Sequence, residues 1–181
     1  MHKIKIAYPD NPDREAESLI KLNPKWWVVK LLESERLTLE KHACKPNPLH
    51  KDHELSAYWA VSLIINEPIN SVFCADKSTQ FNRYNIEVIS RNDPDSRLWD
   101  ISISPSKIDK GKVYVLCLTY LYPHFVFVVG YCFGSTILEH GVKRTHGGVD
   151  KEVLVLSRSR LKNVNELFNY VRSQQIDSQT S

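Results

Sequence analysis

The long, mostly apolar run between Val113 and Phe133, VYVLCLTYLYPHFVFVVGYCF, constrains this chain more than any other feature. A run of about 20 apolar residues is long enough to cross a bilayer as a helix. Pro123 and His124 interrupt its middle, however, and the Val, Tyr, Phe and Thr residues that dominate it favour strands. YPH is also a turn signal between two apolar halves. The run therefore predicts a buried β-hairpin and no membrane span.

Helical patterns precede and follow this hairpin. Pro9–Asn23 predicts a helix, and Glu54–Asn66 predicts one that is apolar almost all round and therefore buried on most sides. Gly134–Glu139 predicts a short helix. Asn163 can cap a final amphipathic helix. The expected buried face of that last helix consists of Leu167, Phe168 and Val171.

Strand patterns fill the segments between these helices. Lys25–Leu32 favours a strand or a buried segment. The short run SVFCA favours a strand, as do the alternating segment LWDISIS and the apolar segment EVLVLS. YNIEVISR alternates most clearly, because successive side chains of a strand point to opposite faces. Its two expected faces are Ile86 with Val88, and Glu87 with Ile89 and Arg91.

The chain of 181 residues fits a single domain. We expect an N-terminal helix and strands over about 10–45 and the main core over about 50–172. The order of helices and strands predicts an α/β or α+β fold, with a mixed central β-sheet flanked by helices.

Charge and cysteine content leave several classes of partner open. The net charge of +3 and the pI of about 8.6 permit a nucleic-acid partner without demanding one. The four cysteines form no CxxC pair, and buried reduced thiols explain them best. The N-terminal sequence has no apolar signal segment, so we expect a cytoplasmic protein. The oligomeric state stays undetermined, and a dimer is plausible.

Two loop segments resemble ligand sites only superficially. His42, Cys44, His50 and His53 lie close together, but their spacing matches no standard zinc pattern. Solvated histidines and a structural thiol are the simpler interpretation. The segment GSTILEHGVKRTHGGVDK places two glycines near Lys143 and Arg144, yet it is not a P-loop, and a plain turn is the simpler interpretation.

The carboxylates of Asp76 and Glu87 are the strongest candidates for chemistry. Asp76 ends the apolar run VFCAD, and Glu87 lies inside a predicted strand. Two carboxylates about 4 Å apart repel by roughly 4 kcal/mol, so a proton, a basic side chain or a divalent cation must offset them. Hard oxygen ligands of this kind suit Mg²⁺. The alternative is an ordinary ion pair of Glu87 with a nearby base. The candidate bases are Lys77, Arg83 and Arg91.

An Asp followed about ten residues later by a Glu inside an apolar strand resembles the signature of the PD-(D/E)XK nuclease superfamily. The surrounding order is similar too, with a buried helix carrying Glu54 before the Asp and the segment DISISPSKIDKGKVYVL after the Glu. The resemblance covers roughly residues 50–170 and implies a restriction endonuclease-like fold. It further implies that Asp76 and Glu87 are catalytic ligands of Mg²⁺, that Glu54 assists them, and that DNA is the substrate.

The chain departs from that signature at its lysine. In the family a lysine stands two residues after the Glu, and here the position holds Ile89. Arg91, on the same predicted strand face, or Lys77 could supply the missing charge, although an arginine cannot act as a base.

Three hypotheses therefore stay open. They are a DNA-acting, metal-dependent nuclease, a catalytically inactive nuclease fold that binds nucleic acid or protein, and a protein-interaction domain. If the chain binds DNA, we expect its lysines and arginines in loops and at strand ends to contact phosphates. These residues are Lys107, Lys110, Lys112, Lys143, Arg144, Arg158, Arg160 and Lys162.

Overall fold

A computed structural model describes six segments of the chain, residues 26–30, 52–66, 84–92, 99–122, 125–145 and 152–177. The predicted helix at Pro9–Asn23 and the predicted run SVFCA lie outside these segments. Within them the protein is a mixed α+β fold with two sheets and three helices, as the element order predicted.

The central sheet contains the predicted hairpin. Its two strands pair antiparallel from Val113↔Phe133 to Tyr122↔Phe125, and irregularities in register follow Leu116 and Leu118. The hairpin prediction is confirmed, and in the described part of the chain no helix is long and apolar enough to cross a membrane. The strands, in sheet order, are β1 (Trp27–Lys30), β5 (Phe125–Phe133), β4 (Val113–Tyr122) and β2 (Ile86–Arg91).

The pairing within this sheet is mixed. β1 runs antiparallel to β5, whereas β2 runs parallel to β4, with Glu87 opposite Tyr114. Parallel neighbours need a crossover between them, which here leaves the sheet after Arg91 and returns at Val113. Part of that crossover forms a second sheet.

The second sheet is antiparallel and smaller. Its strands, in order, are β3 (Ile101–Ile103), β7 (Glu152–Leu156) and β6 (Val142–Thr145). β6 was not predicted, because all four of its residues are exposed and the strand shows no apolar alternation. It forms on the template of β7, through the register Val142↔Val155 to Thr145↔Glu152.

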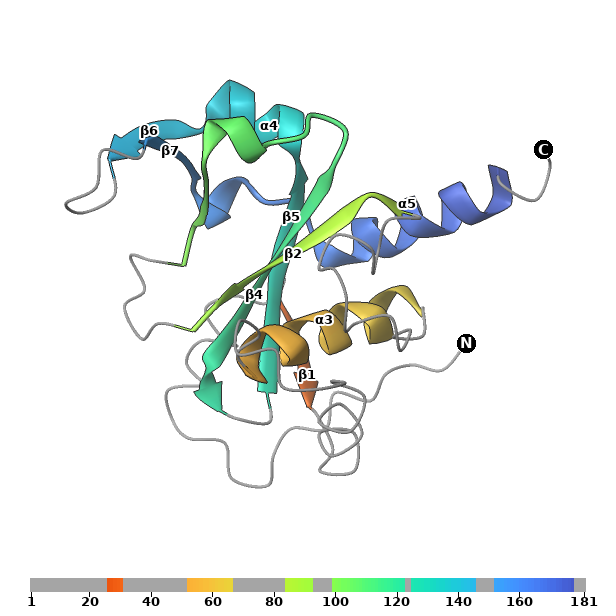
Figure 1. The fold of residues 1–181 in the computed structure, drawn as a ribbon. Coiled ribbons are helices and arrows are strands. Elements are labelled where there is room, and N and C mark those ends of the chain that lie inside the picture. The colour runs from red at the N-terminus through yellow and green to blue at the C-terminus, as the bar shows by residue number, and fades with distance from the viewer. Residues whose placement is uncertain are drawn as a thin grey trace, which may run out of the picture.

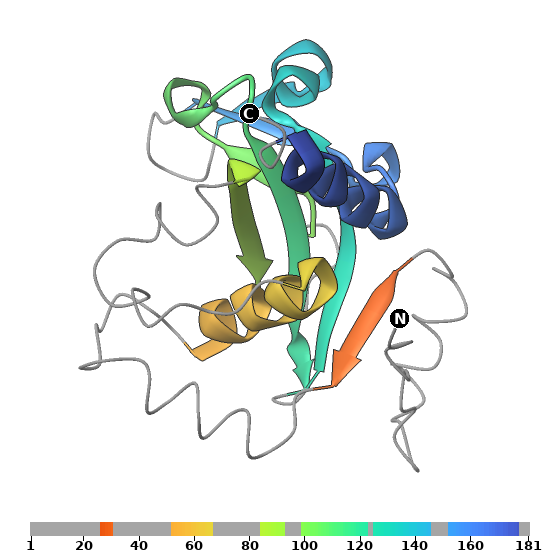
Figure 2. The same ribbon diagram turned by 90° about the vertical axis from the view of Figure 1, so that its right-hand side faces the viewer.

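Helices cover the two faces of the central sheet differently. α3 and α5 pack on one face, and α4 and the second sheet pack on the other (Figures 1 and 2). The helices are α3 (Asp52–Ile65), α4 (Gly134–His140) and α5 (Val164–Asp177). Short 3₁₀ turns follow β3 and β7, at η4 (Pro105–Lys107) and η5 (Arg158–Arg160).

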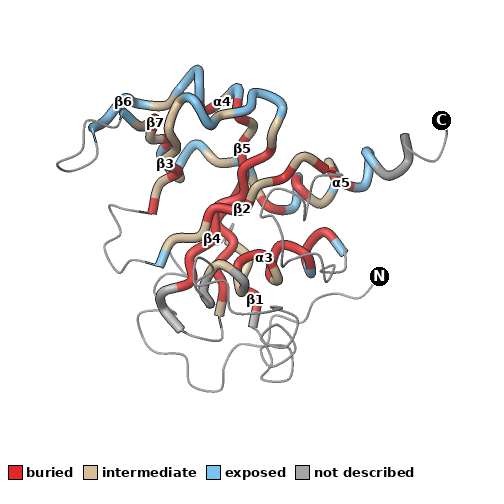
Figure 3. Tube along the Cα trace, in the orientation of Figure 1, coloured by how far each residue is buried: buried red, intermediate tan, exposed pale blue. Residues whose placement is uncertain are grey.

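The core therefore has two layers, one on each side of the central sheet (Figure 3). Val113, Val115 and Cys117 of β4 face α3 and α5, while Tyr114 and Leu116 face the second sheet. A strand buried on both faces carries an almost continuous apolar run rather than an alternating one. This burial explains why residues 113–133 resemble a membrane span in sequence.

The helix predictions that fall on described residues hold with one correction. α3 is buried on most sides, as its composition indicated, although Leu63 is 37% exposed. In α5 the buried residues are Val164, Leu167 and Val171, whereas Phe168, expected in the buried face, is only half-buried. Positions 164, 167 and 171 follow the helical repeat of three and four, and Phe168 stands at the margin of that stripe.

Candidate active site at the end strand β2

Glu87 lies on β2, the last strand of the described central sheet, and on the face that carries the second sheet and α4. The two strand faces are as predicted. Ile86 and Val88 join the core beneath α3, and Ile89 joins the core on the opposite side. The Glu87 side chain is 43% exposed, so its carboxylate is accessible to a ligand from solvent.

The partner of Glu87 is Lys112, at 3.1 Å from Nζ to Oε2. Lys112 immediately precedes β4, and the parallel register of β2 and β4 brings the two residues together across 25 positions of sequence. Arg91, the one described residue among the bases expected to pair with Glu87, does not take this role. Among the described residues, the other carboxylate oxygen of Glu87 has no hydrogen-bond partner.

Ile89, which stands where the resemblance to the nuclease signature would place a lysine, is buried in the core between the two sheets. The Arg91 side chain is directed elsewhere. Its Nε and Nη2 donate to the carbonyl oxygens of Asp100 (3.2 Å) and Ser102 (3.3 Å). Burial lowers the pKa of Arg91, and the nearby Asp100 carboxylate partly opposes that shift. Arg91 thus joins β2 to β3, about 13 Å along the strand from Glu87.

Glu54 lies on α3, near the same end strand. The pKa of the Tyr58 hydroxyl is raised mainly by burial, and to a smaller extent by the negative charges of Glu87 and Glu54. The Tyr58 hydroxyl also shares a hydrogen bond with the backbone of Val88. The structure therefore brings Glu54 and Glu87 within electrostatic range of one buried hydroxyl.

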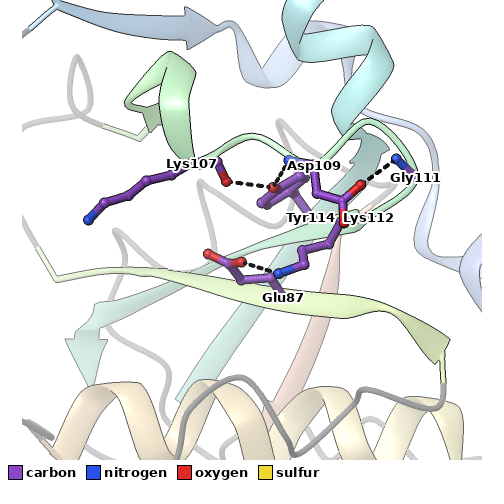
Figure 4. Close-up of polar contacts among 6 residues, drawn as sticks. All are labelled: Glu87, Lys107, Asp109, Gly111, Lys112 and Tyr114. Carbon is purple, nitrogen blue, oxygen red and sulfur yellow. Dashed lines mark hydrogen bonds and ion pairs between the residues drawn. The ribbon is translucent and has the colours of Figure 1, made fainter.

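The segment Ser104–Lys112, from the residue before η4 to the start of β4, borders Glu87 (Figure 4). We call it the lysine platform, because Lys107, Lys110 and Lys112 project from it. Sequence patterns alone gave these lysines a shared role as phosphate contacts. The structure separates Lys112, which pairs with Glu87, from Lys107 and Lys110, which are exposed and have no side-chain partner among the described residues.

The other basic candidates are mostly engaged. Lys143 pairs with Glu152 at 3.1 Å, and Arg158 lies 3.8 Å from Asp100 and over the Trp99 ring. Lys162 lies over the Phe133 ring, 5.3 Å from its centre. Lys143, Arg144 and Thr145 line a shallow cavity of about 420 Å³ together with Glu152. Arg144 and Arg160 are exposed.

Asp76, the second proposed metal ligand, lies outside the described residues, as do Lys77 and Arg83. Within the described segments no three His, Cys, Asp or Glu side chains come together as a metal cluster. The fit of a divalent cation therefore depends on Glu87, whose accessible carboxylate oxygens are of the hard type that Mg²⁺ takes.

Sequence reasoning missed the role of Tyr114. It lies inside the apolar run and is fully buried, yet its hydroxyl contacts the lysine platform at both Lys107 and Asp109. A polar atom at the end of an otherwise apolar ring gives no periodicity signal.

No protein-family model, curated protein or solved structure matches this chain.

Proposed function

We propose that this chain has a restriction endonuclease-like core that hydrolyses phosphodiester bonds in DNA with the help of a divalent cation. The observation that carries the proposal is the ion pair of Glu87 and Lys112, partly open to solvent at the end strand of the sheet. The family resemblance implies an acidic residue and a lysine side by side in the reacting site. Here the lysine is Lys112, the residue just before the neighbouring strand β4, instead of a residue at position 89.

Lys112 has two roles in this proposal. Its ammonium group, 3.1 Å from the Glu87 carboxylate, holds that side chain in position at the end strand. The same group supplies positive charge where negative charge develops on a phosphate, which the apolar side chain of Ile89 cannot do. Lys112 is 24% exposed, so it is partly desolvated and still within reach of a substrate.

Glu87 would hold the cation together with Asp76, as the resemblance implies, whereas Glu54 lies on α3, on the opposite face of the central sheet from the Glu87 side chain. Mg²⁺, when bound, lowers the pKa of a water molecule and stabilises charge on the phosphate. Because Ile89 is part of the core and Arg91 binds backbone carbonyls, neither contributes to the reacting groups in this arrangement.

The test is a cleavage assay on fluorescent duplex, single-stranded and branched DNA with Mg²⁺ or Mn²⁺. We expect metal-dependent cleavage that falls by about 100-fold or more in Glu87→Gln, because one oxygen ligand and its charge are lost. Glu139→Gln is the matched control, since Glu139 is 73% exposed on α4 and, among the described residues, pairs with His140 alone. Exposed ion pairs contribute about 0–1 kcal/mol, so both variants should fold.

A catalytically inactive nuclease fold is the second candidate, and the burial of Ile89 favours it. The lysine of the nuclease signature is absent, and Ile89 at that position packs in the core instead. This candidate predicts DNA binding without cleavage at any metal concentration, and binding that Glu87→Gln does not weaken. Cleavage by the wild type that survives Glu87→Gln would contradict both candidates.

A further inference from the structure

We propose that the lysine platform, Ser104–Lys112, is a preformed site for the phosphate backbone of DNA, with Lys107 and Lys110 as its contacts. This inference rests on the proposed function only in taking DNA as the partner. It adds how the substrate is held, and it applies equally to a catalytic and to an inactive nuclease fold.

Hydrogen bonds to the backbone of the platform hold it in place. The Asp109 N–H donates to the Tyr114 hydroxyl at 3.1 Å, and that hydroxyl donates to the Lys107 carbonyl at 3.4 Å. The Asp109 carboxylate accepts the Gly111 N–H at 2.9 Å and closes the turn before β4. Because Tyr114 is fully buried in the sheet, the positions of Lys107 and Asp109 are tied to the core.

α4 holds the other end of the platform. The Ser135 N–H donates to the Lys110 carbonyl at 3.1 Å, and the Gly134 N–H donates to the Lys112 carbonyl at 2.8 Å. A β-carbon on Gly134 would overlap the Asp109 carbonyl oxygen, so the two backbones are in close contact there. Lysines on such a segment bind with less loss of backbone freedom than lysines on a mobile loop.

The charges of the platform point to an anion. Lys107 and Lys110 are exposed and have no acidic partner among the described residues, whereas Lys112 and Lys143 each have one. The single acid within the platform, Asp109, faces its own turn through Gly111. Figure 4 shows the Lys107 side chain extending away from the Glu87–Lys112 pair. A DNA strand that follows the platform would therefore pass both Lys107 and this pair.

The chemistry of the platform suits phosphates better than bases. Lysine is a point charge that binds phosphate without reading sequence, and Ser104 and Ser106, whose hydroxyls lie 3.2 Å apart, add neutral hydrogen-bonding groups. We therefore expect binding that depends on salt and not on base sequence. Each phosphate contact contributes about −0.9 to the slope of log K against log salt for duplex DNA.

The experiment measures duplex DNA binding by the full chain in EDTA, where cleavage cannot occur, between 50 and 200 mM salt. Lys107→Gln/Lys110→Gln should lower the magnitude of the salt slope by about 1.8. Over this fourfold range of salt, that change makes the affinity about 12-fold less sensitive to salt. Arg172→Glu is the charge-matched control, because it also lowers the net charge by two and Arg172 is exposed, unpaired within the described residues and not among the expected phosphate contacts.

The control should keep the wild-type slope. Equal slopes for Lys107→Gln/Lys110→Gln and Arg172→Glu would mean that net charge alone governs binding, and would overturn the platform. A wild-type slope in Lys107→Gln/Lys110→Gln would overturn it too. Thermal melts check that each variant is folded. Cleavage by the wild type combined with an unchanged slope refutes the platform alone. A platform-dependent slope without cleavage refutes the hydrolysis alone, and absence of any DNA binding refutes both.

Discussion

Replacing Tyr114 with Phe tests the anchoring of the lysine platform, because it removes one oxygen atom and keeps the buried ring. The ring fills the core between the sheets and is fully buried. The hydroxyl accepts from the Asp109 N–H at 3.1 Å and donates to the Lys107 carbonyl at 3.4 Å. Loss of the hydroxyl therefore removes two hydrogen bonds to the platform, at Asp109 and Lys107, and leaves only the space of one oxygen atom.

The expected cost follows from these two bonds. A hydrogen bond contributes about 1 kcal/mol net, and the 3.4 Å bond should contribute less than the 3.1 Å bond. We expect Tyr114→Phe to lower the free energy of unfolding by about 1.5 kcal/mol, which for a chain of this size lowers Tm by about 3–6 °C. Burial raises the pKa of Tyr114, so the donor persists at neutral pH and the effect should be constant between pH 6 and 8.

Urea unfolding and hydrogen exchange at the Asp109 amide measure the two consequences. Tyr131→Phe is the matched control, because Tyr131 is also buried and its hydroxyl makes no hydrogen bond within the described residues. Faster exchange at Asp109 in Tyr114→Phe, but not in Tyr131→Phe, is the expected result. Equal stability and equal exchange in the two variants would refute the anchoring role of the Tyr114 hydroxyl.

Three further predictions concern stability. Gly134→Ala should cost about 1–3 kcal/mol, because its β-carbon would overlap the Asp109 carbonyl, whereas Gly111→Ala should change stability by under about 0.5 kcal/mol; equal unfolding midpoints would contradict this contrast. Arg91→Lys should cost about 1–2 kcal/mol in urea unfolding, since an ammonium group cannot reproduce the fork that holds two carbonyls, and wild-type stability would count against that role. Burial raises the pKa of Cys132 to about 12. The neutral thiol therefore stabilises the fold fully below the pKa of an unfolded cysteine, about 8.5, and this part of the free energy of unfolding is lost as pH rises toward 12. Unfolding measured from pH 8 to 11 should show this decline, and Cys132→Ala should make it shallower; a flat profile would disprove it.

Local pattern was enough to predict the elements that dominate the core. The two halves of the run Val113–Phe133 pair as an antiparallel hairpin, and alternation along β2 correctly separated Ile86 and Val88 from Glu87. The cap of α5 was also predictable, since Asn163 Oδ1 accepts the Asn165 N–H at 2.9 Å. In each of these cases, the physical cause lies within a few residues of the element.

The partner of Glu87 could not be predicted in the same way. Lys112 reaches it only because β2 and β4 are parallel neighbours, and their register is set by the packing of the whole sheet. Sequence proximity instead drew attention to Arg91, whose strand face was correctly predicted but whose guanidinium binds β3. β6 escaped prediction for a related reason, because its four residues are exposed and its place in the sheet depends on pairing with β7 and not on a local pattern.

The measurement that tests the central proposal most directly is single-turnover cleavage by Lys112→Met, with protein in excess over DNA and Mg²⁺ saturating. If Lys112 replaces the lysine of the family signature, the rate at saturation should fall by about 100-fold or more, while the DNA dissociation constant changes by less than tenfold. Lys110→Met should show the reverse, with weaker binding and a nearly unchanged rate. A wild-type rate for Lys112→Met would contradict the proposal that Glu87 and Lys112 form the reacting pair.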